Sequence, residues 1–467
     1  MKICKKLLPL IIAGALFSCN EIKKEAEPLG RLQVSDNGRF LTQDGKPFFW
    51  LGDTGWLLFN KLTRAEAEMY LEDRSNKGFN VVQAMVLHTV PSVNVYGDSS
   101  ITNNDVSQPL ITQGNNPEDE MEYDYWDHVD FIIDVAAQKG IYMALVPVWG
   151  TPVKDGQVNA AQARSYATFL AERWKDKSNI IWLNGGDIKG SDSTQVWQEI
   201  GHAIKAVDKN HLMTFHPRGR TASSDWFHEA PWLDFNMVQS GHRNYQQDTS
   251  ADEKNHYGPD NFKYIQVDWD LKPVKPTIDG EPSYEGIPHG LHDINLPRWT
   301  DADVRRYGYW SVFAGAFGYT YGQSSVIQMH VASDTLPAYG STELWSEAIN
   351  APGAGQMQHI KKLMLSKENY FGRIPDQSII AVNGERYERL LATRTDDYAF
   401  IYSYTGAPMQ INMGKIKGDM VKASWFNPRN GETTAIGEFE NNGVQKFEAK
   451  GEVKEGNDWV LILESIT

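Results

Sequence analysis

The chain has 467 residues, more than one ordinary core needs, and this length fits a large barrel followed by one smaller domain. Its composition, 41% hydrophobic and 22% charged, is that of a globular protein. A formal net charge of −15 repels polyphosphate, so nucleic acid is not an expected partner, and an acidic polysaccharide would need local basic residues that override this field.

The N-terminal segment has the features of a bacterial export signal. A lysine-rich start precedes an apolar run over residues 7–17, which is too short for a stable membrane span. The run ends in Leu-Phe-Ser-Cys at residues 16–19, which resembles a lipobox and implies cleavage before Cys19 and lipidation of that residue. We therefore expect a signal peptide over 1–18, a polar tether over 19–30, and a lipid anchor in the bacterial outer membrane, on its cell-surface or periplasmic face.

Both cysteines, Cys4 and Cys19, lie in this leader. The folded body is therefore expected to contain no disulfide and no thiolate metal site.

From residue 31 the chain alternates between strand-like and helical segments, after a short hairpin over 31–49. Mostly apolar runs typical of buried parallel strands cover 48–53, 80–86, 141–146, 180–184, 212–216, 235–240, 276–281 and 317–323. Helical spacing covers 62–77, 124–139, 160–177, 196–207 and 301–316, and a last stretch, 343–365, is expected to break near 351–353.

Eight strands alternating with helices predict an α/β fold, a (β/α)8 TIM barrel over residues 31–372. A doubly wound open sheet is the alternative. It is less favoured because no glycine-rich phosphate loop follows the first strand, and because several strands end in polar or aromatic residues.

Residues 373–467 change to short alternating segments at 389–393, 398–404, 421–426 and 459–463, which predict a small antiparallel β-sandwich.

Two carboxylates stand where this fold places catalytic groups, at the carboxyl ends of barrel strands. Asp187 follows the fourth strand and Glu281 ends the seventh, so the two side chains should face each other across the barrel mouth. Glycosidic cleavage needs one carboxyl group to protonate the leaving oxygen and another to attack or stabilise the oxocarbenium-like centre. We expect Asp187 to be the acid/base, with a raised pKa, and Glu281 to be the nucleophile. A helix cap or a loop salt bridge is the alternative role for either residue.

The distance between these two carboxyl groups would set the stereochemistry. A separation of about 5–5.5 Å predicts a retaining double displacement, and a larger one predicts inversion.

Other polar and aromatic residues near strand ends are candidates for substrate binding: Asp53, Trp56, His88, Trp149, Asn184, His216, Arg218, His242, Tyr284, Tyr321 and Gln323. The aromatic rings suit the apolar faces of sugars, the histidines and the asparagine could bind hydroxyls or orient the nucleophile, and Arg218, with Arg220, could meet a uronate. Core packing, a satisfied structural histidine or a solvated loop arginine is the alternative in each case. No H-x-H or H-E-x-x-H spacing occurs, so neither a metal nor another cofactor is expected.

Several motifs resemble the apiosidase-like glycoside hydrolases of gut Bacteroidetes, family one hundred and forty. They are FWLGDTGW at 49–56, NGGD at 184–187, DGEPSYE at 279–285 and, in the last domain, WFNPRNG at 425–431, where the resemblance is to a sandwich domain often labelled collagen-binding. The resemblance implies hydrolysis of apiosyl linkages in the pectin rhamnogalacturonan II, with a pectic glycan as partner. It also implies that Asp187 is the acid/base and Glu281 the nucleophile. Glu285 is close enough in sequence to compete with Glu281 for that role.

Two other functions remain open from the sequence. One is an endo-glycanase or exo-glycosidase acting on another plant polysaccharide, with the same barrel and carboxylates. The other is a glycan-binding lipoprotein on a barrel without catalysis, which the presence of both carboxylates disfavours.

Overall fold

The computed structural model describes residues 29–251 and 254–466. The predicted signal peptide, the lipidation site Cys19 and residues 19–28 of the predicted tether lie outside the described residues. Within the described ranges, no helix combines the length and the apolar character that crossing a bilayer requires.

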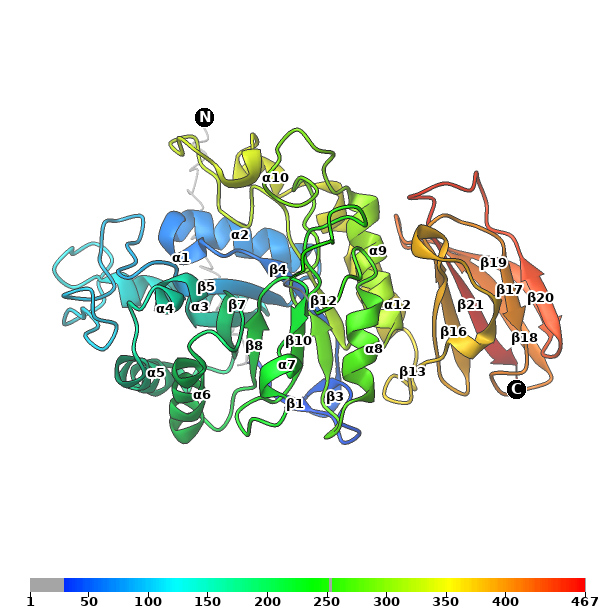
Figure 1. The fold of residues 1–467 in the computed structure, drawn as a ribbon, viewed down its shortest axis with the longest axis horizontal. Coiled ribbons are helices and arrows are strands. Elements are labelled where there is room, and N and C mark those ends of the chain that lie inside the picture. Colours follow the sequence, from blue (N-terminus) through cyan, green and yellow to red (C-terminus); the bar gives the residue numbers. More distant parts are fainter. Residues whose placement is uncertain (1–28, 252–253, 467) are drawn as a thin grey trace, which may run out of the picture.

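A nine-stranded sheet curls into the barrel in the order β8-β7-β6-β5-β4-β12-β11-β10-β9, and all eight predicted strands are present in it (Figure 1). Its strands are β4 (Trp50–Thr54), β5 (Val81–Leu87), β6 (Tyr142–Val148), β7 (Ile180–Ile188), β8 (Met213–Pro217), β9 (Thr221–Ala222), β10 (Asn236–Gln239), β11 (Thr277–Asp279) and β12 (Gly318–Tyr321). Their side chains are almost entirely buried, as expected for parallel strands covered by helices.

The barrel closes between β8 and β10. The backbone N–H of Asp234 donates to Met213 O at 2.8 Å, and Thr214 Oγ1 donates to Phe235 O at 2.6 Å. Further along, the short strand β9 pairs antiparallel with β10, Ala222 opposite Val238. The predicted TIM barrel is thus confirmed, with this extra strand at its seam.

Helices surround the sheet: α1 (Leu58–Lys61), α2 (Arg64–Asn76), α3 (Tyr125–Gln138), α4 (Gly150–Lys154), α5 (Ala160–Trp174), α6 (Thr194–Val207), α7 (Ser224–Phe227), α8 (Phe262–Asp270), α9 (Asp301–Phe313), α10 (Trp345–Ala348), α11 (Pro352–Gln356) and α12 (Gln358–Leu365). Capping boxes start α2, α3 and α5 at Thr63, Asp124 and Asn159. The stretch 343–365 is three short helices, and α11 begins at Pro352, within the predicted break. The helix α8 was not predicted.

A small sheet of β1 (Leu32–Val34), β2 (Leu41–Gln43) and β3 (Lys46–Phe48) precedes the barrel. The C-terminal domain packs a six-stranded antiparallel sheet against a three-stranded one. The larger sheet contains β13 (Ile374–Pro375), β15 (Leu391–Arg394), β16 (Tyr398–Ser403), β18 (Met420–Phe426), β19 (Thr433–Glu440) and β21 (Trp459–Ile466), and the smaller contains β14 (Ile380–Val382), β17 (Met409–Asn412) and β20 (Val444–Phe447). Single 3₁₀ turns are η1 (Ala338–Gly340), η2 (Gln377–Ile379) and η3 (Arg386–Glu388).

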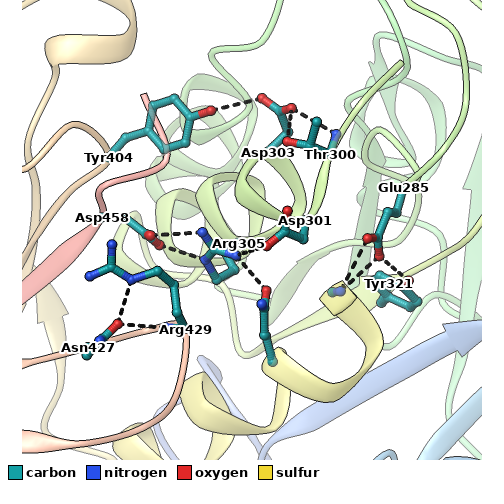
Figure 2. Close-up of polar contacts among 12 residues, drawn as sticks. Glu285, Thr300, Asp301, Asp303, Arg305, Tyr321, Tyr404, Asn427, Arg429 and Asp458 are labelled. Carbon is teal, nitrogen blue, oxygen red and sulfur yellow. Dashed lines mark hydrogen bonds and ion pairs between the residues drawn. The ribbon is translucent and has the colours of Figure 1, made fainter. Parts of the chain in front are cut away.

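Helix α9 joins the barrel to this domain, which lies to its right in orange and red in Figure 1. The rings of Tyr309 and Tyr402 stack at 4.7 Å with an interplanar angle of 6°. Arg305 of α9 donates to both oxygens of Asp458, at 2.9 and 3.0 Å, and both side chains are at most 2% exposed (Figure 2). Buried apolar residues of the two domains form one continuous cluster, so the domains are fixed to each other.

Candidate active site

A cavity of about 630 Å³ opens at the carboxyl ends of the barrel strands. This volume is in the range of pockets that bind small ligands. Its lining includes nine residues singled out from the sequence: Trp56, His88, Trp149, Asp187, Arg218, Arg220, His242, Glu281 and Tyr284. The two candidate catalytic carboxylates therefore share one cavity.

Asp187 reaches this cavity through an irregular end of β7. Gly185, Gly186 and Asp187 have positive φ angles of 90°, 117° and 47°, and the pairing with β8 shifts register here. A Cβ on Gly185 would come 2.7 Å from His216 O, and one on Gly186 would come 2.5 Å from the Trp149 ring, so both positions require glycine. The two glycines between Asn184 and Asp187 thus let the strand turn and present the carboxylate.

Two histidines hold Glu281. Nε2 of His242 lies 3.1 Å from one carboxylate oxygen, and Nε2 of His216 lies 3.2 Å from the other. Burial alone would raise the pKa of Glu281, but the His216 and His242 contacts outweigh it and hold the pKa at about 2. Glu281 is therefore ionised at neutral pH.

The position of the proton on His216 follows from its other contact. Nδ1 of His216 accepts a hydrogen bond from the backbone N–H of Asp187 at 3.3 Å, so this nitrogen carries a lone pair. In the neutral ring the proton is then on Nε2, where it faces Glu281.

Asp187 has the opposite protonation preference. Its side chain is open to the cavity, yet the surrounding protein replaces much of the water around it. This desolvation, followed by the charge of Glu281, raises the pKa of Asp187 to about 6. One carboxyl group able to hold a proton thus lies near a second that stays ionised.

Aromatic rings form much of the wall around this pair. Trp56 and Trp149 pack against each other at 5.2 Å and both contact the ring of His216, at 5.2 and 5.8 Å. Tyr284 packs on His242 at 4.9 Å. These contacts hold the two histidines against aromatic residues that line the cavity, the residue type that packs on sugar rings.

Five predicted substrate ligands do not line the cavity. His216 lies behind the wall, against Glu281. Asp53 faces the helix layer, where it pairs with Arg74 at 2.7 Å and accepts from the Tyr70 hydroxyl at 2.6 Å. Asn184 donates to Trp197 O on α6, Tyr321 donates to Glu285, and Gln323 accepts from the N–H groups of Ser325 and Val326. All five are buried with their polar groups in contact with protein, which places them as structural or positioning residues.

Glu285, the competitor of Glu281, lies away from the cavity. Its carboxylate accepts hydrogen bonds from the Tyr321 hydroxyl at 2.5 Å and from the N–H of Gly353 at 3.0 Å (Figure 2). This carboxylate binds the first turn of α11 to the barrel, and the geometry favours Glu281 as the nucleophile.

Several lining residues were missed, chief among them Tyr339, which stands in η1 with a φ of 58°. Burial, then the charges of Glu281 and Asp187, raises the pKa of Tyr339 to about 12. The only sequence signal was an aromatic residue in a polar loop after the last strand. Other missed lining residues are Lys61, Met85, Gln239, Arg243 and Leu336.

Among residues 29–251 and 254–466, no group of three or more histidine, cysteine, aspartate and glutamate side chains has the geometry to hold a metal ion.

Comparison with known proteins gives the same outline. A family model described as "Apiosidase-like, catalytic domain" matches residues 35–371, and one described as "Putative collagen-binding domain of a collagenase" matches residues 374–464. A solved glycoside hydrolase is 50% identical, with a TM-score of 0.88 over 93% of this chain and 97% of that chain. A family 5 glycoside hydrolase structure from Bacteroides vulgatus is 45% identical, with a TM-score of 0.88 over 93% and 94% of the two chains. No curated protein is similar enough in sequence to count as a match.

Proposed function

Because this chain belongs to the apiosidase-like family of glycoside hydrolases, we propose that it cleaves apiosyl linkages in the pectin rhamnogalacturonan II. The family membership supports apiose as the sugar, and the residues of the cavity support hydrolysis as the reaction. The observation that supports hydrolysis most directly is that two carboxyl groups share one cavity in different environments, which raise the pKa of Asp187 to about 6 and hold that of Glu281 at about 2.

The proposed reaction is a retaining double displacement. Asp187 donates its proton to the glycosidic oxygen while Glu281 attacks the anomeric carbon, so that the aglycone leaves and a glycosyl ester forms on Glu281. Asp187, now a carboxylate, then takes a proton from water, and the water oxygen displaces Glu281 from the anomeric carbon. His216 and His242 orient Glu281 and keep it ionised before it attacks, and they stabilise its carboxylate again when water displaces it.

The cavity walls would bind the sugar by two kinds of contact. The rings of Trp56 and Trp149 offer apolar faces, whereas His88, Arg218 and Tyr339 offer polar groups to hydroxyls and to any carboxylate of the pectic chain. We also propose that a lipid on Cys19 anchors the mature protein to the bacterial outer membrane, with residues 20–30 as tether.

A panel of plant cell-wall glycans tests the proposed linkage. The soluble form that lacks residues 1–19 is incubated with rhamnogalacturonan II oligosaccharides, with other pectic fragments and with neutral hemicelluloses. Release of side chains that carry a reducing apiose supports the proposal. Cleavage of another glycan, with rhamnogalacturonan II left intact, would replace the apiosyl linkage by that one and would leave the hydrolase class unchanged.

A further inference from the structure

Two further cavities lie at the junction of the barrel and the C-terminal domain, with volumes of about 400 and 370 Å³. Both are lined by barrel loops on one side and by the segment around η3 on the other, and both share Tyr245 and Arg386. The two cavities therefore form one interrupted groove, the junction groove.

The junction groove begins where the active-site cavity ends. Residues 241–243 line the active-site cavity, and residues 244–246 line the groove. In the second loop, Gly290 lines the active-site cavity and His289 lines the groove. The two loops are joined by a hydrogen bond from the Gly290 N–H to His242 O at 2.7 Å. The junction groove therefore adjoins the active-site cavity across these two loops.

Two arginines of the C-terminal domain face the groove without a carboxylate partner. Among the described residues, neither Arg386 nor Arg389 forms an ion pair, and Nε of Arg389 is buried without a hydrogen-bond acceptor. Each guanidinium instead lies over an aromatic ring of the barrel, Arg386 over Tyr245 and Arg389 over Phe262, both at 4.9 Å. Stacking of this kind fixes the plane of a guanidinium and leaves its N–H edge available for a planar anion.

Arg386 also has a backbone φ of 52°, which a non-glycine residue adopts at a cost.

The acidic residues of the groove do not neutralise these arginines. Asp260 is bound by the Tyr245 hydroxyl at 2.5 Å and by Lys263 at 2.8 Å. Asp303 accepts hydrogen bonds from the N–H and hydroxyl of Thr300, the N-cap of α9, and from the Tyr404 hydroxyl at 3.1 Å (Figure 2). Glu455 has a pKa raised by burial and then by Asp303, and Glu385 is exposed and pairs with neither arginine.

We propose that Arg386 and Arg389 form a subsite for the carboxylate of a uronic acid residue, at a part of the substrate chain remote from the cleaved bond. The inference rests on the proposed function, since it assumes that an acidic pectic glycan passes through the active site. It gives the C-terminal domain a direct part in substrate binding. It also supplies the local basic site that a chain with a net charge of −15 needs for an acidic polysaccharide.

The junction is built to hold this subsite in place. Arg305 and Asp458 bind the domain to α9 beneath the groove, and Tyr309 and Tyr402 stack beside them. A rigid frame lowers the entropy lost when a carboxylate binds.

Calorimetric titration tests the subsite without turnover. In a soluble Glu281→Gln background, a short oligogalacturonide and its carboxyl-reduced, neutral counterpart are titrated into the parent and into Arg386→Gln/Arg389→Gln. We expect the double variant to weaken binding of the oligogalacturonide by about ten- to hundredfold, the range for a lost charge-assisted contact. We expect the neutral glycan to bind both proteins equally.

A charge-matched control removes Lys417 and Lys446, two exposed lysines of the same domain that line none of the three cavities. Lys417→Ala/Lys446→Ala should bind the oligogalacturonide as the parent does. Equal affinity of the arginine variant and the parent would overturn the subsite, as would a loss of the same size in the lysine control. Neither result depends on hydrolysis, so failure of the subsite is distinguishable from failure of the proposed linkage.

Discussion

Nδ1 of His216 accepts a hydrogen bond from the backbone N–H of Asp187 at 3.3 Å. Its other nitrogen, Nε2, lies 3.2 Å from Glu281 Oε2. One buried ring thus connects the strand end that carries the candidate acid to the candidate nucleophile.

Replacement of this ring should disturb the nucleophile first. His216→Phe keeps the aromatic volume between Trp56 and Trp149 but removes the contact that lowers the pKa of Glu281. We expect kcat/KM to fall about ten- to hundredfold, because a hydrogen bond to a charged group contributes about 1.5–3 kcal/mol. The acidic limb of the pH profile should also move to higher pH. The exposed His202→Phe on α6 is the control, and an unchanged acidic limb in His216→Phe would contradict the role.

The pH dependence follows from the two carboxyl groups. The reaction needs Asp187 protonated and Glu281 ionised, so kcat/KM should fall as the pH rises through about 6 and as it drops toward about 2. In Glu281→Gln the neighbouring charge is gone while burial remains, so the pKa of Asp187 should fall and yet stay above its ordinary value. Nuclear magnetic resonance titration of labelled aspartate measures this. An Asp187 that titrates at its ordinary pKa in the wild type would contradict its assignment as the acid.

The eight barrel strands could be predicted because buried parallel strands are continuous apolar runs, a signal that does not depend on distant residues. The seam between β8 and β10 could not be predicted in the same way. It depends on β9, a two-residue strand, and the nearby α8 has aromatic and charged residues in a short segment, so neither has a clear period.

The site was predictable in part for a related reason. Asp187 and Glu281 stand at strand ends, which the apolar runs locate. Asp53 and Asn184 stand at strand ends too, yet they face the helix layer. A strand buried on both faces gives no polar alternation from which that direction can be read. Tyr339 comes from a loop whose path only the folded chain defines.

Loss of Glu285 should lower the stability of the protein, whereas loss of Glu281 should lower its activity. Glu285→Ala leaves two buried donors, the Tyr321 hydroxyl and the Gly353 N–H, without their acceptor, at a cost of about 1–3 kcal/mol each in the free energy of unfolding. We expect a lower Tm with kcat per folded molecule unchanged, measured by thermal melting and active-site titration. A Glu285→Ala protein with normal Tm and no activity would transfer the nucleophile role to Glu285.

The junction between the domains should respond to loss of a single carboxylate. Asp458→Ala removes the bidentate partner of the buried Arg305 guanidinium and leaves Asp301, at 2.6 Å, as its carboxylate partner, which costs about 1.5–3 kcal/mol in the free energy of unfolding. We expect a lower denaturant midpoint and one cooperative transition for both domains. The control is Glu448→Ala, which breaks an exposed ion pair with Lys446 and should leave the denaturant midpoint essentially unchanged. Similar midpoints for the two variants would show that Arg305–Asp458 does not hold the junction.

The central claim is that Asp187 and Glu281 together hydrolyse the glycosidic bond. The most direct measurement compares wild type, Asp187→Asn and Glu281→Gln on the glycan that the panel shows to be cleaved, with the exposed Asp155→Asn as control. We predict that Asp187→Asn loses about 10²–10⁴-fold in kcat, the usual contribution of a general acid, that Glu281→Gln loses at least as much, and that Asp155→Asn is unaffected. Hydrolysis at the wild-type rate by either Asp187→Asn or Glu281→Gln would contradict the claim.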